Sequence, residues 1–180
     1  MRKLLLIGAC LFGVPSAYAD SVVKHGRWES FTLNQGDYIN GCAIIGNREA
    51  DISIRFAYTE GFGSTIDLTI KDSSYVKNDL SFLLKYGDKT RIFSDSVVSY
   101  DNNEVTLSND SGLKTLSDIV DELQMYENIN ISSKDIKTTN MLGMYKNNID
   151  ISLSGYKETL NDFYSCIEEI KKQDENNSKK

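Results

Sequence analysis

Histidine is the scarcest residue in this chain that could act as a general base or a metal ligand. His25 is the single histidine, so a Ser–His–Asp or Cys–His arrangement would have to use it. A zinc site would need further histidine or cysteine ligands beside it. His25 lies near the N-terminal end, in a segment that we expect to be flexible. The sequence therefore predicts neither a catalytic residue nor a metal site at His25.

Paired carboxylates could also carry acid–base chemistry, and the chain has 26 acidic residues, so pairs arise by chance. Two groups stand out: Glu49 with Asp51, and a set on the outer face of an expected helix, Asp118, Asp121 and Glu122. A glycosidase needs a defined separation across a cleft, and a calcium loop needs oxygen ligands at fixed positions. We interpret these carboxylates as solvated surface groups, and we predict no catalytic residue, no metal and no cofactor.

The first residues have the pattern of a secretory signal peptide. Arg2 and Lys3 precede an apolar run at residues 4–14, and Ala17-Tyr18-Ala19 places small residues where signal peptidase reads them. We therefore predict a signal peptide at residues 1–19. No second apolar run reaches membrane-spanning length, so we expect no transmembrane segment. The expected location of the exported protein is the periplasm.

A lipobox is the competing interpretation of the same segment. Residues 7–10, Ile-Gly-Ala-Cys, resemble one, and Cys10 would then become a lipidated N-terminus. Cys10 lies inside the apolar run, so cleavage there would leave only a stub of the hydrophobic region. The signal peptidase interpretation is favoured for that reason.

The remaining cysteines are Cys42 and Cys166, and export would place them in an oxidising compartment. Two cysteines in an exported protein predict a disulfide, the alternative being two buried free thiols. If the cysteines are joined, the chain has no thiolate nucleophile.

The chain is acidic, with a net charge of −6 that becomes −8 once residues 1–19 and their two basic side chains are removed. This charge is unsuited to nucleic acid or to an anionic membrane surface. A protein partner is the better expectation. Tyrosine gives contact area at low entropic cost, and the candidates for a binding surface are those in expected turns, Tyr38, Tyr100 and Tyr145.

Alternation of apolar and polar residues predicts a strand-rich domain. The expected strands are at residues 52–58, 66–70, 82–86, 91–93, 97–98, 105–107, 129–131 and 149–153. A glycine-bearing turn at residues 58–64 predicts a hairpin. Trp28 is expected to be an anchor of the core.

Two helices are expected beside these strands. One has Leu116, Ile119, Val120 and Leu123 on one face, with Thr115 and Asp118 as a capping box. The other is C-terminal, runs from a cap at Ser154 to about residue 170, and ends at Lys171 and Lys172. The predicted fold is α+β and predominantly antiparallel β, sandwich- or barrel-like. It forms one domain at residues 20–170, followed by a disordered tail at 171–180.

Four features of the chain are informative together: Gly26-Arg27-Trp28, Cys42, a helix leading into a strand at residues 116–131, and the segment Ile-Ser-Leu-Ser-Gly-Tyr-Lys-Glu-Thr-Leu at residues 151–160, followed by Phe163 and Cys166. This layout resembles the invasion-associated locus B family of exported bacterial proteins. It implies a small β-rich domain of the periplasm or outer membrane, linked in some pathogens to host-cell interaction. It implies no established enzymatic chemistry.

These observations predict a non-enzymatic interaction protein of the cell envelope. The alternative is a periplasmic inhibitor or immunity protein that binds and blocks an enzyme, because an acidic domain would be steered toward a basic target.

Export predicts a defined N-terminus. N-terminal sequencing of the protein from a periplasmic fraction is expected to begin at Asp20, because residues 17–19 form the cleavage signal. A lipid-modified Cys10, or full-length protein retained in the cytoplasm, would contradict this expectation.

Overall fold

The structure is a computed structural model that describes residues 19–35, 38–71, 81–94, 96–101, 104–132, 138–139, 145–146 and 148–177. Residues 1–18, and with them nearly all of the predicted signal peptide and Cys10, lie outside the described residues. In the described part of the chain, no helix combines the length and the apolar character needed to cross a membrane.

A seven-stranded antiparallel sheet forms the body of the described fold. Its strand order is β1 (Ala19–His25), β2 (Trp28–Gln35), β3 (Tyr38–Gly46), β4 (Ile52–Thr59), β5 (Gly63–Lys71), β9 (Glu104–Asp110) and β8 (Val97–Asp101). Strands β1 and β8 are the two edges, so the described strands form no closed barrel.

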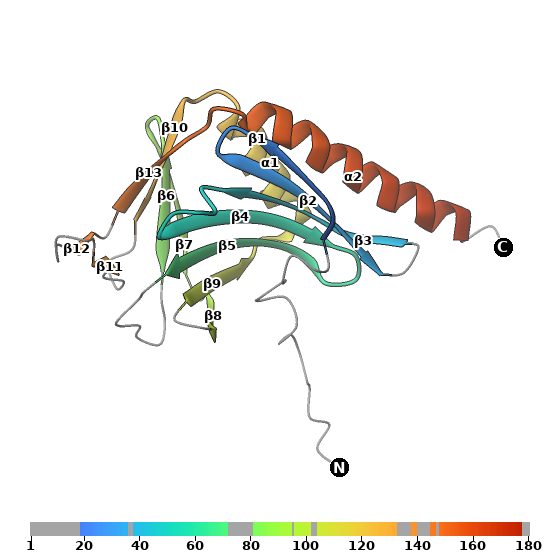
Figure 1. Cartoon of the computed structure of the whole chain (residues 1–180), viewed down its shortest axis with the longest axis horizontal. Coiled ribbons are helices and arrows are strands. Elements are labelled where there is room, and N and C mark those ends of the chain that lie inside the picture. The colour runs from blue at the N-terminus through green and yellow to red at the C-terminus, as the bar shows by residue number, and fades with distance from the viewer. Residues whose placement is uncertain are drawn as a thin grey trace, which may run out of the picture.

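Two smaller sheets complete the described strands. A four-stranded sheet has the order β13 (Asn148–Ser152), β10 (Asn128–Ser132), β6 (Phe82–Tyr86) and β7 (Lys89–Phe93), and it lies at one end of the large sheet (Figure 1). Strands β11 (Thr138–Thr139) and β12 (Tyr145–Lys146) form a two-stranded ribbon.

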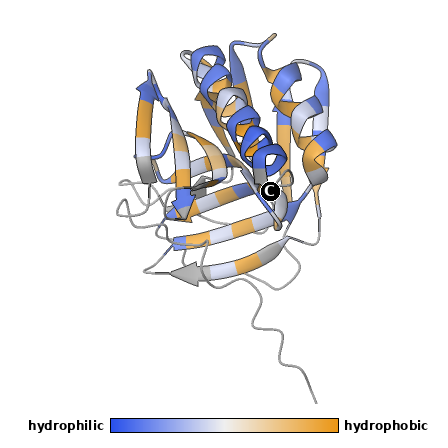
Figure 2. Ribbon diagram, turned by 90° about the vertical axis from the view of Figure 1, so that its right-hand side faces the viewer, coloured by the Kyte–Doolittle hydropathy of each residue, from blue (hydrophilic) through white to orange (hydrophobic). Residues whose placement is uncertain are grey.

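Both helices lie on one face of the seven-stranded sheet. Helix α1 (Gly112–Leu123) contacts β4 and β5, and helix α2 (Tyr156–Asn177) contacts β1, β2 and β3. Each helix turns its apolar residues toward the sheet and its polar residues outward (Figure 2). The expected α+β fold, with mainly antiparallel strands and a second helix at the C-terminal end, is confirmed.

The expected strand periodicity is confirmed at the centre of the sheet. Ile54 and Phe56 of β4 are fully buried, as are Ile66 and Leu68 of β5, because alternate side chains point to the face that the helices cover. Strands β4 and β5 pair as an antiparallel hairpin around the predicted glycine-bearing turn.

Trp28 is the largest fully buried side chain, and its predicted role in the core is confirmed. Its ring lies 6.3 Å from that of Phe56 and 4.6 Å from that of Tyr156, centroid to centroid. Its Nε1 donates a hydrogen bond of 2.9 Å to the carbonyl oxygen of Ser152. Gly46 leaves room for the indole, since a Cβ atom there would lie 2.7 Å from the ring. Trp28 thus joins the large sheet to β13 and α2.

Helix α1 begins earlier than the sequence indicated. Its N-cap is Ser111, without a side-chain cap, so the predicted capping box at Thr115 and Asp118 is wrong. The chain passes directly from β9 into the helix: the Ser111 amide still bonds to the Ser64 carbonyl at 3.1 Å, and Gly112 turns with a φ of +65°. Sheet pairing therefore sets where this helix starts.

Helix α2 continues to Asn177, so the structure differs from the prediction that residues 171–180 form a disordered tail. Lysine, glutamine and glutamate are good helix formers and extend the helix without an apolar face. Gln173 also holds this end in place, because its Oε1 accepts a hydrogen bond of 3.1 Å from the Ile39 amide. The predicted end at Lys171 and Lys172 is wrong for the same reason.

The carboxylates of α1 are not merely solvated. Glu122 accepts a hydrogen bond from the Tyr86 hydroxyl at 2.7 Å and pairs with Lys89 at 2.8 Å and Arg91 at 3.3 Å. Lys89 and then Tyr86 are the main causes that lower the pKa of Glu122 to about 2. Asp121 accepts from the Tyr164 hydroxyl at 2.8 Å. These two acids tie α1 to the β6–β7 hairpin and to α2.

We predict that no side chain is tolerated at Gly155, where the β1–β2 turn meets the start of α2. Gly155 has a φ of +85°, and a Cβ atom there would overlap the backbone carbonyl of His25. We expect Gly155→Ala to lower the free energy of unfolding by about 3 kcal/mol or more, since a backbone clash adds to the strain of positive φ. Denaturant unfolding monitored by Trp28 fluorescence measures this loss.

Gly61 is the matched control. Its φ is +75° and a Cβ atom would meet nothing within 4 Å, so Gly61→Ala should cost only the strain of about 1–2 kcal/mol. Equal losses for the two variants would show that the turn does not pack closely on α2.

Candidate functional site

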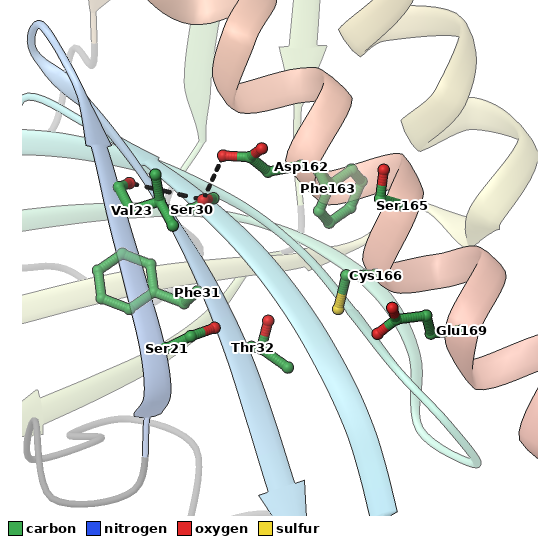
Figure 3. Close-up of a pocket in the computed structure, with 10 residues that line it drawn as sticks. All are labelled: Ser21, Val23, Ser30, Phe31, Thr32, Asp162, Phe163, Ser165, Cys166 and Glu169. Atoms are coloured by element: carbon green, nitrogen blue, oxygen red, sulfur yellow. Dashed lines mark hydrogen bonds between the residues drawn. The ribbon is translucent and has the colours of Figure 1, made fainter.

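A hollow of about 180 Å³ lies between helix α2 and the β1–β2 hairpin. Figure 3 shows the strands along one side of it and the helix along the other. The described residues that line it are Ser21, Val23, Ser30, Phe31, Thr32, Asp162, Phe163, Ser165, Cys166 and Glu169.

Secondary-structure spacing brings these side chains together. Asp162, Ser165 and Glu169 are three and four residues apart, which places them on one flank of α2. On the sheet, Val23 of β1 pairs with Ser30 of β2. Residues two apart on a strand share a face, so Ser21 and Thr32 lie beside this pair on the helix-covered side.

The disulfide between Cys42 and Cys166 is present, as the sequence predicted. It joins β3 to α2, with a Cα–Cα distance of 6.0 Å and 124 residues between the two cysteines. Both cysteines are buried, and Cys166 lines the hollow. The bond therefore fixes how far the helix stands from the sheet beside the hollow.

Asp162 is the polar centre of the upper end of the hollow. One of its oxygens, Oδ2, accepts a hydrogen bond of 2.9 Å from the Ser30 hydroxyl and lies 2.9 Å from Nε2 of His25 (Figure 3 shows the serine bond). The expectation that His25 lies in a flexible segment is wrong. His25 ends strand β1, pairs with Trp28, and ties the hairpin to α2.

This cluster contains the three residue types of a hydrolase triad in a different order. In a triad, histidine lies between serine and aspartate and takes the proton from the serine hydroxyl. Here Asp162 lies between Ser30 and His25, and the two bonds end on the same carboxylate oxygen. The arrangement orients the hairpin and gives the Ser30 hydroxyl a carboxylate acceptor in place of an imidazole.

Glu169 lies at the lower end of the hollow, about 10.5 Å along the helix axis from Asp162. Its side chain is exposed, and no described residue pairs with it. The described lining thus has two carboxylates, the hydroxyls of Ser21, Ser30, Thr32 and Ser165, and no lysine or arginine. Such a lining accepts hydrogen bonds and attracts cations. In the described residues, no group of three histidine, cysteine or acidic side chains could hold a metal ion.

The predicted tyrosines are placed by their backbones only, because their side chains lie outside the described residues. Tyr38 begins β3, Tyr100 of β8 pairs with Val105 of β9, and Tyr145 of β12 pairs with Thr139 of β11. All three backbones therefore lie in strands and not in turns. Strands β4, β5 and β9 separate β3 from β8. The structure does not bring the three backbones to one place.

Sequence reasoning missed Asp162, Glu169 and Ser30. One signal was available: Asp162 and Glu169 are seven residues apart on the helix that carries Cys166. That spacing puts both acids on the same flank, beside the cysteine that was expected to face the sheet.

Comparison with known proteins gives a likeness of fold. No family model matches the chain, and no curated protein matches its sequence. Among solved structures, invasion associated protein B from Bartonella henselae matches with a TM-score of 0.55 and 10% sequence identity. The match covers 83% of this chain and 98% of that one. The two proteins share a fold, in line with the resemblance seen in the sequence.

Reduction of the disulfide is expected to destabilise the protein. Opening a loop of 124 residues restores unfolded-state entropy, with an upper value of about 4–5 kcal/mol. Denaturant unfolding with and without reductant measures the loss, and thiol titration of the unfolded, unreduced protein should find no free thiol at Cys42 or Cys166. An unchanged unfolding midpoint after reduction would contradict this prediction.

Proposed function

We propose that this protein is an exported, non-enzymatic binding protein of the bacterial envelope that takes part in host-cell interaction. One observation carries the proposal: the fold matches nearly the whole of a protein named for its association with invasion. The disulfide supports export, because such bonds persist in oxidising compartments.

The geometry of the hollow supports binding over catalysis. The single histidine bonds to Asp162 and not to Ser30, so the arrangement gives the serine no histidine base. Both described cysteines are joined and cannot act as nucleophiles. The remaining polar groups of the lining are hydroxyls and carboxylates, which suit recognition of a cationic partner.

Host-cell entry is the direct test of this proposal. A strain that lacks the protein is expected to enter cultured host cells less often than its parent, and the full chain should restore entry. The matched control is a chain without residues 1–19, which should remain in the cytoplasm and restore nothing. Normal entry by the deletion strain, or full restoration by the control, would contradict the proposal.

Catalysis is tested separately with the purified protein. We expect no turnover of peptidoglycan, glycan or peptide substrates. Turnover that is lost in Asp162→Asn or Ser30→Ala, with the variant still folded by its unfolding curve, would show that the protein is an enzyme.

A further inference from the structure

We propose that the hollow and the free edge of β1 together bind a basic, extended peptide segment, which adds to the sheet as a strand and places its cationic side chains against Asp162 and Glu169. This inference rests on the proposed function and names the chemistry of its partner.

β1 pairs with β2 on one side, and no described strand pairs with its other side. His25 and Trp28 close the turn between the strands. In such a hairpin the closing residue His25 directs its backbone N–H and C=O groups toward β2, and the direction alternates along the strand. The N–H and C=O groups of Lys24 and Val22 therefore face the free edge. A strand can bond to these groups without disturbing the β1–β2 pairing.

Val22 and Val23 are 46% and 43% exposed, so each offers apolar surface to an added strand. Lys24 lies on the face away from the helices, where it pairs with Glu29 at 3.3 Å and Glu49 at 3.2 Å. Its charge is thereby balanced and does not oppose a basic partner.

An added strand lies about 4.8 Å beyond β1, and its alternate side chains point to the helix-covered face. A lysine or arginine stem on that face can extend over Ser21 and Val23, which line the hollow, toward α2. Asp162 and Glu169 are about 10.5 Å apart along the helix, between the spacings of about 7 and 13 Å for strand residues two and four apart. Flexible lysine or arginine stems can make up the remaining difference of about 3 Å, so basic residues at alternate positions can reach both carboxylates.

The described lining holds two carboxylates and no lysine or arginine, and the chain as a whole has a net charge of −6. The imidazole of His25 lies beside the hollow and is already bonded to Asp162. A second copy of this chain would bring the same acids to the shared edge, so like charges disfavour it as the occupant.

The probe is a short, end-capped peptide in which lysine and threonine alternate. A peptide of the same composition with its lysines in one block is the control, because it has the same charge and a different side-chain pattern. Calorimetric titration at low salt compares the two peptides on the mature protein. The alternating peptide should bind at least about twofold to fivefold more tightly than the block peptide, as expected for one ion pair gained. Equal binding of the two peptides would overturn the inference.

Glu169→Gln tests the lower carboxylate, and Glu168→Gln is its matched control. Both residues are exposed on α2, and only Glu169 lines the hollow. We expect Glu169→Gln to weaken binding of the alternating peptide about twofold to fivefold and Glu168→Gln to leave it unchanged. The same loss in both variants would mean that the peptide senses only net charge, which would overturn the proposed site.

Val22→Pro tests strand addition. The amide of Val22 faces the free edge, so proline removes a bond to the added strand and none to β2. We expect peptide binding about twofold to tenfold weaker, the loss of one hydrogen bond, with an unchanged unfolding midpoint. If the midpoint falls, an N-methylated alternating peptide tests the same bonds from the other side, and its full binding would overturn the inference.

Two further outcomes would also overturn it: equal competition by the polyamine spermidine, and a dimer of the free protein in sedimentation that Val22→Pro abolishes. The host-entry test is independent of the peptide. If entry depends on the protein and no peptide binds, this inference fails and the proposed function stands.

Discussion

The bond between Cys42 and Cys166 determines where the last helix lies. It joins β3 to α2 across 124 residues, and the packing of Trp28 against Tyr156 holds the start of the same helix. Because α2 is fixed above β2 and β3, only its flank faces β1. The hollow lies along that flank, lined by side chains of both hairpin strands and of the helix.

The close approach at Gly155 and the hydrogen bonds of Asp162 depend on this placement. Asp162 reaches Ser30 and His25 only because α2 passes over the turn end of the β1–β2 hairpin at this residue. Ser21 and Ser30 are small, and they leave open the space that larger side chains would fill. A site thus arises where the helix stops covering the sheet, as is common for pockets between packed layers.

Local patterns predicted most strands, because one face of the sheet is buried and the chain alternates accordingly, as in Ile54 and Phe56. Local patterns failed where a hydrogen bond between residues distant in sequence sets the end of a helix. Pairing of Ser111 with Ser64 starts α1 early, and the bond from Ile39 to Gln173 accompanies the extension of α2. The site escaped prediction since its contacts are remote in sequence: His25 and Asp162 are 137 residues apart.

An exposed edge strand is an aggregation hazard as well as a possible binding edge, because its unpaired backbone groups accept any extended chain. Val22 and Val23 add apolar surface to the β1 edge and increase that hazard. Asp162 and Glu169 oppose pairing between two copies of the chain, since two copies meeting at β1 would bring four carboxylates near one another. The same charges that oppose self-association favour a basic strand. The β1 edge is then selective because it repels a second copy of this chain and attracts a basic strand.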